Sequence, residues 1–201
     1  MAVGSVLFFD GADTDLCKKY NNMGKIIASE WISLDGIYDA GTMNQWWLPY
    51  DSPERQQYIQ QVIQDCDSML YGRKTYQMLY PYWSGLKNNE IGVAGKLNAV
   101  KKYLVSSTLK KGEWENTTII GIDELGAIKK ATGGNILITG SGSLVAALIK
   151  AGLVDEVKLL VQPHIMGTGE RFFAEDMQGA LQLNASRLLD KGVMQLCYAV
   201  I

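Results

Sequence analysis

Three short polar stretches have residue types suited to binding phosphate, and each one follows a short apolar run. Gly72, Arg73, Lys74 and Thr75 follow residues 68–71, Ser106, Ser107 and Thr108 follow residues 101–105, and Gly140, Ser141, Gly142 and Ser143 follow residues 136–139. Small residues let backbone amides approach a ligand closely, hydroxyl groups donate hydrogen bonds, and Arg and Lys supply positive charge. The same residue types also form ordinary turns, so their meaning depends on whether the fold brings them together.

The stretch around Gly140 shows the clearest passage from strand to helix. Ile136, Leu137 and Ile138 form an apolar run without alternation, which is typical of a strand covered on both faces in a parallel sheet. A helix beginning near Ser143 would direct unpaired N–H groups and its positive dipole end at whatever lies in the turn. A dinucleotide fingerprint would need a third glycine where Val145 stands, so a phosphate site and a simple tight turn both remain open.

The stretch at Gly72 places two cations in the first turn of a predicted helix. Arg73 and Lys74 oppose the helix dipole there, by roughly 0.3 to 1 kcal/mol each. A bound phosphate would compensate for this cost. The alternative is a basic pair that is simply solvated.

Aromatic residues and one carboxylate gather before another predicted helix. Trp46, Trp47 and Tyr50 stand close to Asp51, and aromatic faces of this kind can line a pocket for a flat ring. The alternative is that the tryptophans are core anchors and that Asp51 or Ser52 only caps the helix, ahead of a proline at its first position.

Composition limits the classes of function. The chain of 201 residues has 47% hydrophobic and 20% charged residues and a net charge of -2, which is typical of an ordinary soluble domain and argues against a general nucleic-acid surface. Its three cysteines (Cys17, Cys66, Cys197) are far apart, which predicts no disulfide framework and favours a reducing cytoplasm. With His164 as the only histidine, we predict no metal centre, and a metal-dependent hydrolase is poorly supported. No apolar run is long enough to span a membrane.

The order of elements predicts an α/β fold. Residues 1–22 are interpreted as an extension that is flexible or adds an edge segment, and residues 23–201 as a single domain. Strands are predicted over 25–34, 68–71, 101–106, 117–121, 135–139 and 154–161, and helices over 53–65, from 72, over 123–130 and from 143 to 151. Residues 181–189 and 193–201 form a predicted hairpin.

Alternation of strands and helices followed by a hairpin predicts a central, mainly parallel mixed sheet with an antiparallel edge and helices on both faces. Ligands of such sheets bind at the carboxyl ends of the strands. The three polar stretches are therefore expected to meet at the edge where a nucleotide would bind.

The order of these motifs resembles the dihydrofolate reductase-like superfamily, and more closely the RibD C-terminal domain family of bacterial bifunctional riboflavin-biosynthesis deaminase/reductases. The resemblance covers about residues 24–201 and implies a dihydrofolate reductase-like three-layer fold. The motifs that carry it are Ser33-Leu34-Asp35-Gly36, Trp47-Leu48-Pro49-Tyr50-Asp51, Gly72-Arg73-Lys74-Thr75-Tyr76, Val105-Ser106-Ser107, the segment from Ile136 to Leu144, Val154-Asp155-Glu156-Val157 and the loop from Pro163 to Phe173.

The resemblance implies an NADPH-dependent reductase acting on a small planar heterocyclic (pterin- or pyrimidine-like) or carbonyl substrate. It implies that Asp51 is the catalytic pocket carboxylate and that Asp35, Trp46 and Gln162 contact the substrate. The implied cofactor-binding residues are Gly72, Arg73, Lys74 and Thr75 for the phosphates, Ser106 and Ser107 near the adenosine 2′-phosphate, and Thr139, Gly140, Ser141, Gly142, Ser143 and Leu144 for the pyrophosphate and the nicotinamide side.

A competing hypothesis is a non-catalytic nucleotide-binding protein that keeps the cofactor cleft, because no strong acid-base pair is obvious in the sequence. A homodimer is expected under either hypothesis. The final strands are apolar at alternate positions and end at the sheet edge, and related reductase domains pair as dimers.

Overall fold

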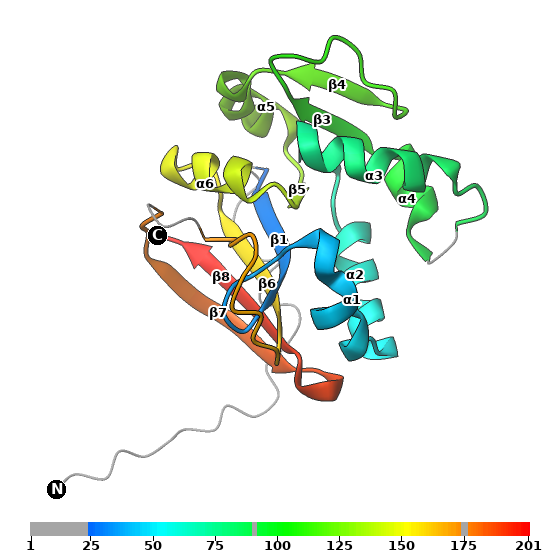
Figure 1. Cartoon of the computed structure of the whole chain (residues 1–201). Helices are drawn as coiled ribbons and strands as arrows, with labels where there is room; N and C mark the ends of the chain where they lie inside the picture. The colour runs from blue at the N-terminus through cyan, green and yellow to red at the C-terminus, as the bar shows by residue number, and fades with distance from the viewer. Residues whose placement is uncertain (1–23, 90–91, 174–176) are drawn as a thin grey trace, which may run out of the picture.

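A computed structural model describes residues 24–89, 92–173 and 177–201, and the predicted extension over 1–22 lies outside these ranges. The centre of the fold is an eight-stranded sheet with the order β4-β3-β2-β5-β1-β6-β8-β7 (Figure 1). Its strands are β1 (Ile26–Ser33), β2 (Ser68–Gly72), β3 (Lys101–Val105), β4 (Thr117–Ile120), β5 (Ile136–Thr139), β6 (Glu156–Gln162), β7 (Leu181–Leu188) and β8 (Met194–Val200).

The sheet is parallel from β4 to β6, and β8 then pairs antiparallel with both β6 and β7. The predicted mainly parallel sheet with an antiparallel terminal hairpin is therefore confirmed. All five residues of β2 and the first three of β5 are buried, as expected for strands covered on both faces.

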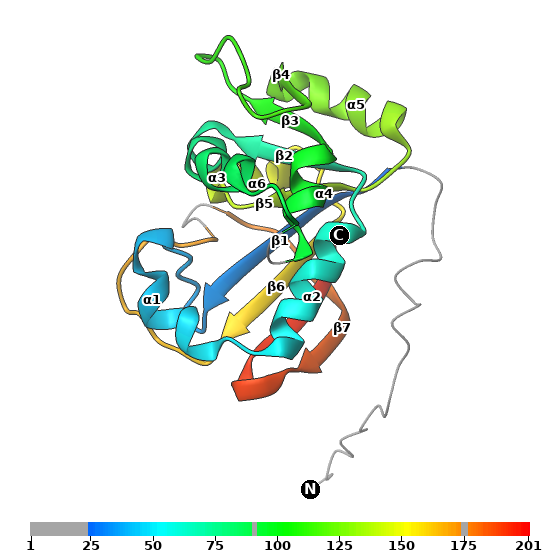
Figure 2. The same ribbon diagram turned by 90° about the vertical axis from the view of Figure 1, so that its right-hand side faces the viewer.

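Helices cover both faces of the sheet, which confirms the predicted three layers (Figure 2). On one face, α2 (Pro53–Gln64), α3 (Arg73–Gly85) and α4 (Ala94–Ala99) bury a core with Met69 and Leu104. On the other face, α5 (Leu125–Thr132) and α6 (Gly142–Lys150) bury a second core with Leu70 and Ile138. In the described residues, no helix has the length and hydropathy needed to cross a membrane.

The two helices that begin at the polar stretches lack side-chain caps, whereas α2 has one. Ser52 caps α2, because its Oγ accepts a hydrogen bond from the Arg55 amide at 3.2 Å, and Pro53 follows at the first helical position. Gly72 precedes α3 and Ser141 precedes α6, and neither makes a side-chain cap hydrogen bond. Both helices therefore start with amides that a bound anion could satisfy.

Candidate functional site

The three polar stretches lie at the same edge of the sheet. Strands β3, β2 and β5 are direct neighbours and run parallel, so the residues after their carboxyl ends, Ser106, Gly72 and Gly140, are brought together. This convergence was predicted from the sequence, and it places two helix N-termini and a hydroxyl-rich turn along one rim.

The junctions after β2 and β5 touch directly. A Cβ added at Gly72 would lie within 3.0 Å of the Ser141 Cβ, and one added at Gly140 would lie 3.0 Å from the Thr75 Cγ2. Gly140 and Ser141 both have left-handed backbone, with φ of 75° and 69°, which is unusual for a serine. Glycine at positions 72 and 140 therefore lets the two turns approach each other closely.

Positive charge without a counter-charge lies at this contact. Arg73 and Lys74 are exposed in the first turn of α3. Within residues 24–89, 92–173 and 177–201, neither side chain forms an ion pair. Two exposed cations beside two uncapped helix starts make this rim suitable for an anionic ligand.

The remaining predicted cofactor residues lie around the same rim. Ser106 already accepts hydrogen bonds from the amides of Thr108 and Leu109, so its hydroxyl shapes the turn, whereas Ser107 is exposed. Thr139 makes a side-chain hydrogen bond with the buried Tyr71. Ser143 is exposed at the start of α6, while Leu144 is buried. A rim with a close glycine contact, exposed cations and an exposed hydroxyl suits a ligand that carries several negative groups.

Glu30 is a residue of this region that sequence reasoning missed. It lies in the middle of β1, one residue after the point where β1 stops pairing with β5. Its carboxylate accepts hydrogen bonds from the amides of Trp31, at 3.1 Å, and Gly140. Its Oε2 is shielded from solvent and has no partner among the described residues. Burial raises the pKa of Glu30 to about 7, although the two amides oppose the shift. The sequence signal was an acidic residue within a mostly apolar strand.

Asp51, the predicted catalytic carboxylate, has partners on the helix that follows it, α2. Its Oδ1 accepts hydrogen bonds from Arg55 Nη2 and from Gln56 Nε2, both at 2.8 Å. Partial burial would raise the pKa of Asp51, but these hydrogen bonds and the Arg55 charge outweigh it and hold the pKa below its usual value. Asp51 is therefore an ionised carboxylate tied to Arg55, and it does not line the neighbouring cavity described below.

The aromatic residues before α2 pack on one another. Trp47 stacks on Trp31 with ring centroids 3.9 Å apart, and the Arg55 guanidinium lies 3.6 Å from the centre of the Trp47 ring. Trp46 is 1% exposed, and its indole N–H donates to the Asp39 carbonyl at 3.1 Å. For Trp46 the structure thus shows a core anchor, the alternative reading of the sequence, and its ring offers no surface to a substrate in this conformation.

A small cavity lies between β1 and α2, next to the glycine turn. Thr139 connects it to the rim, and the other lining residues are Ser29, Trp31, Tyr58, Ile59, Val62 and Ile63. Its volume of about 20 Å³ has room for about one water molecule. A planar substrate would therefore bind here only if side chains such as Trp31 moved.

Two further predicted substrate residues have structural partners. Asp35 accepts hydrogen bonds from Ser33 Oγ at 2.6 Å and from the amides of Met166 and Gly167, which lowers the pKa of Asp35 to about 2. Its carboxylate thus ties the turn after β1 to the loop after β6. Gln162 is fully buried at the end of β6, where its Nε2 donates to the Leu160 carbonyl at 3.4 Å and its Oε1 has no partner among the described residues.

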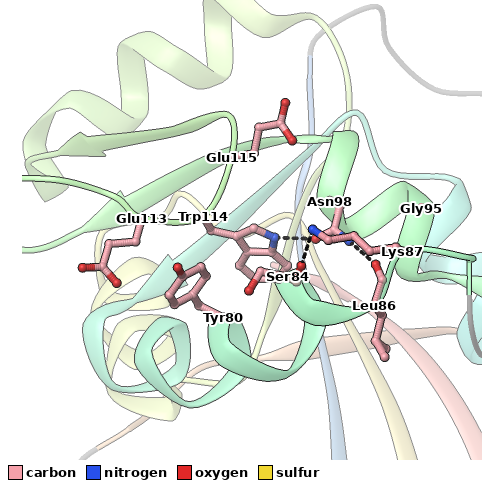
Figure 3. A pocket seen from close by; sticks show the side chains of 9 residues that line it. All are labelled: Tyr80, Ser84, Leu86, Lys87, Gly95, Asn98, Glu113, Trp114 and Glu115. Carbon is pink, nitrogen blue, oxygen red and sulfur yellow. Dashed lines mark hydrogen bonds between the residues drawn. The ribbon is translucent and has the colours of Figure 1, made fainter.

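A larger hollow lies elsewhere in the described residues. It has a volume of about 460 Å³ and lies between the end of α3, the helix α4 and the segment before β4, with Tyr80, Asn98 and Trp114 among its lining residues (Figure 3). The indole of Trp114 donates to Asn98 Oδ1 at 2.7 Å. These segments precede β3 and β4, so this hollow lies at the amino ends of the strands, opposite to the rim where the motifs converge.

Comparison with known proteins agrees with this fold. The sequence model of the RibD C-terminal domain family matches residues 24–195. The uncharacterized protein YyaP of Bacillus subtilis (strain 168) is 28% identical over 183 residues, which cover 87% of this chain and 94% of that protein.

Solved structures share the architecture at low sequence identity. A protein from Shewanella sp. PV-4 that is named a riboflavin biosynthesis protein has a TM-score of 0.69 at 19% identity. The match covers 88% of this chain and 99% of that one. The riboflavin biosynthesis reductase Rib7 of Saccharomyces cerevisiae has a TM-score of 0.59 at 13% identity, with coverage of 92% and 93%. Dihydrofolate reductase from Enterococcus faecalis complexed with NADP(H) has a TM-score of 0.60 at 16% identity, with coverage of 89% and 97%.

The matched residues include every strand described above except the last residues of β8, and both the predicted fold and the predicted family are confirmed. The chain belongs to the RibD C-terminal domain family.

Proposed function

We propose that this protein is an NADPH-dependent reductase that transfers hydride to a small planar heterocyclic or carbonyl substrate. The observation that carries the proposal is the contact between the β2–α3 and β5–α6 junctions. Beside it lie the exposed cations Arg73 and Lys74, which form no ion pair among the described residues. The family and the reductases with similar folds support it.

Different residues of the rim would bind different parts of the cofactor. Arg73, Lys74 and Ser107 would bind the adenosine 2′-phosphate, because they supply charge and a hydroxyl at the carboxyl ends of the neighbouring strands β2 and β3. The amides at the start of α6 would bind the pyrophosphate. Thr139 would lie on the nicotinamide side, since it connects the rim to the cavity. When bound, NADPH would supply the hydride, and the protein would supply orientation and electrostatics.

The cavity beside Thr139 is the proposed substrate site. Its walls combine the aromatic Trp31 and Tyr58 with the hydroxyls of Ser29 and Thr139, which suits a flat ring bearing polar atoms. Asp51 would act on the electrostatics of this site from the N-terminal end of α2, and the unpaired Oε1 of Gln162 offers an acceptor from β6. These roles are proposals for mutagenesis.

Cofactor binding followed by turnover tests the proposal. Quenching of tryptophan emission by NADPH should give a saturable titration. Loss of NADPH absorbance should then depend on one class of compound in a panel of folates, pterins, pyrimidines and quinones. In the active class, Asp51→Asn should lower kcat while leaving the Kd for NADPH within about twofold. A protein that binds no NADPH would overturn the proposal.

The second candidate is a non-catalytic nucleotide-binding homodimer. The observation in its favour is the closed cavity: about 20 Å³ cannot admit a planar substrate without rearrangement. NADPH binding without oxidation in the presence of any compound of the panel would favour this candidate over the reductase.

A further inference from the structure

The glycine turn that would receive the pyrophosphate is surrounded by acidic and phenolic groups. Tyr38, in the loop after β1, accepts a hydrogen bond from the Gly142 amide at 3.2 Å and donates one to Glu170 at 2.8 Å. Glu30 binds the Gly140 amide from the neighbouring strand. Two carboxylates therefore lie next to a turn whose amides and cations otherwise favour an anion.

Glu30 differs from Glu170 in its surroundings. Glu170 is exposed, whereas the Oε2 of Glu30 is shielded from solvent and has no partner among the described residues. A buried carboxylate without a counter-charge is costly, so its neutral form is favoured. Protonated, Glu30 would have an O–H group to donate. Ionised, it would repel a phosphate and compete with it for the Gly140 amide.

Other charged groups near this strand do not neutralise Glu30. Lys158 of β6 is in register with Ser29, so it points to the opposite face of the sheet. Arg171, from the loop of Glu170, donates to the Asp35 carbonyl at 2.9 Å. From α3, Arg73 and Lys74 are exposed, and from α6 no ionisable side chain precedes Lys150. Tyr38 also faces Glu30, and burial raises its pKa, so it stays protonated through the neutral range.

We infer that Glu30 belongs to the dinucleotide site: it holds the Gly140 amide in the free protein and carries a proton when the anionic cofactor is bound. This inference rests on the proposed function, because it concerns the same cofactor. It makes binding a proton-coupled step in which the protein takes up one proton on a carboxyl oxygen of Glu30.

The pH dependence of the Kd for NADPH tests this inference. With a pKa of about 7 for Glu30 in the free protein, the wild-type Kd should rise by up to about tenfold per pH unit between pH 7 and 9. The 2′-phosphate, with a second pKa near 6, is about nine-tenths or more doubly ionised in this range, so it adds little to the slope. Glu30→Gln keeps an acceptor for the Gly140 amide and has no charge. Its Kd should be flat with pH and, at pH 8, at least about fivefold lower than the wild-type value.

Glu113→Gln is the matched control, because Glu113 is an exposed carboxylate at the amino ends of the strands. It should keep the wild-type slope. A Glu30→Gln protein that also keeps that slope would overturn the inference while leaving the proposed function intact. If the wild-type protein binds no NADPH between pH 6.5 and 9, the proposed function and this inference are both wrong.

Calorimetry on the wild-type protein gives a readout that does not depend on the variant folding. Titration of NADPH at pH 8 in two buffers of different ionisation enthalpy measures the protons exchanged on binding. We expect uptake of close to one proton per NADPH at pH 8. Uptake near zero would contradict the inference.

Discussion

At the scale of single residues, Arg55 determines what Asp51 can do. The Arg55 side chain is 2% exposed, its Nη1 donates to the Trp47 carbonyl at 2.7 Å, and its second terminal nitrogen is bound by Asp51. A buried guanidinium with one carboxylate partner depends on that partner. Asp51 therefore has a structural role in anchoring the start of α2, whatever further role it has in chemistry.

Removal of the Asp51 carboxylate should destabilise the fold. We expect Asp51→Ala to lower the free energy of unfolding by about 1 to 3 kcal/mol at pH 7, because a charged hydrogen-bond partner is lost. The pKa of Asp51 is lowered in the folded protein, so this contribution is present above its ordinary value near 4 and is lost as the pH falls below it. Urea titrations at pH 7 and pH 3 measure both effects.

Asp65→Ala is the control, since Asp65 is an exposed carboxylate next to α2 that accepts one hydrogen bond, from Gln61. If both variants lose the same free energy of unfolding, the ion pair between Asp51 and Arg55 does not stabilise the fold more than an exposed carboxylate does.

The buried amino group of Lys102 should make the stability of the fold depend on pH. It is fully buried, and its Nζ donates to the carbonyls of Asn98, Val100 and Glu115 at 2.9 to 3.0 Å. Burial lowers the pKa of Lys102 to about 8, and the Glu115 charge only partly offsets this. Between pH 8 and about 10.4 the unfolded state therefore binds more protons. Relative to Lys102→Met, the wild-type free energy of unfolding should rise over this range. Parallel pH curves for the two proteins would contradict the assignment.

At the scale of elements, the site depends on two helix starts in contact. Gly72→Ala would place a Cβ within 3.0 Å of the Ser141 Cβ, so β2 and the glycine turn must move apart. We expect a loss of about 1 to 3 kcal/mol in stability and a weaker affinity for NADPH. Adding Ser141→Gly removes the clashing atoms and suits the left-handed backbone there, so the double variant should recover stability.

Gly85→Ala at the end of α3 is the control, because nothing lies within 4 Å of the added Cβ. If Gly72→Ala behaves like Gly85→Ala in chemical denaturation and NADPH titration, the contact does not position the rim.

The elements that the sequence predicted are those with strong local signals. The strands are short apolar runs, and α2 has both a serine cap and a proline at its first position. The helix α4 was missed because its six residues include a glycine and have no capping side chain. Convergence of the three polar stretches followed from the general rule for parallel sheets. The contact between Glu30 and Gly140 could not be predicted from that rule, because it depends on which strands become neighbours in the sheet.

The predicted pocket beside Trp46, Trp47 and Asp51 shows that residue types alone do not distinguish a binding pocket from a packed core. Aromatic and acidic residues before a helix suit a ring-binding pocket and a packed core equally well. The Arg55 side chain determines how these residues pack, because it stacks on Trp47 and binds Asp51. Arg55 lies in the first turn of α2, and the sequence predicted this helix without showing where its side chains point.

At the scale of the whole molecule, the terminal hairpin has an uncovered face. Every residue of β7 is exposed, including Leu183 at 51% and Leu188 at 67%. Leu183 pairs with Tyr198, and Leu188 pairs with Met194, so these apolar side chains share one face. The strand lies at the outer edge of the sheet (Figure 1). An exposed apolar edge of this kind favours self-association, which is the predicted homodimer.

Multi-angle light scattering tests the homodimer. We expect a dimer mass for the wild-type protein at micromolar concentration and a shift toward monomer for Leu183→Glu. The control is Met78→Glu, an exposed apolar residue of α3 away from the hairpin. A monomer mass for the wild-type protein would show that the predicted homodimer is wrong.

The affinities for NADPH and NADH, compared in wild type and Arg73→Ala, test whether the rim after β2 binds the 2′-phosphate of NADPH. A charge-assisted hydrogen bond contributes roughly 1.5 to 3 kcal/mol. The variant should therefore lose about tenfold or more in NADPH affinity, and less than about threefold in NADH affinity. Lys101→Ala, which removes an exposed cation at the amino end of β3, should change neither. Equal losses for NADPH and NADH in Arg73→Ala, or no binding of NADPH by the wild-type protein, would contradict the account.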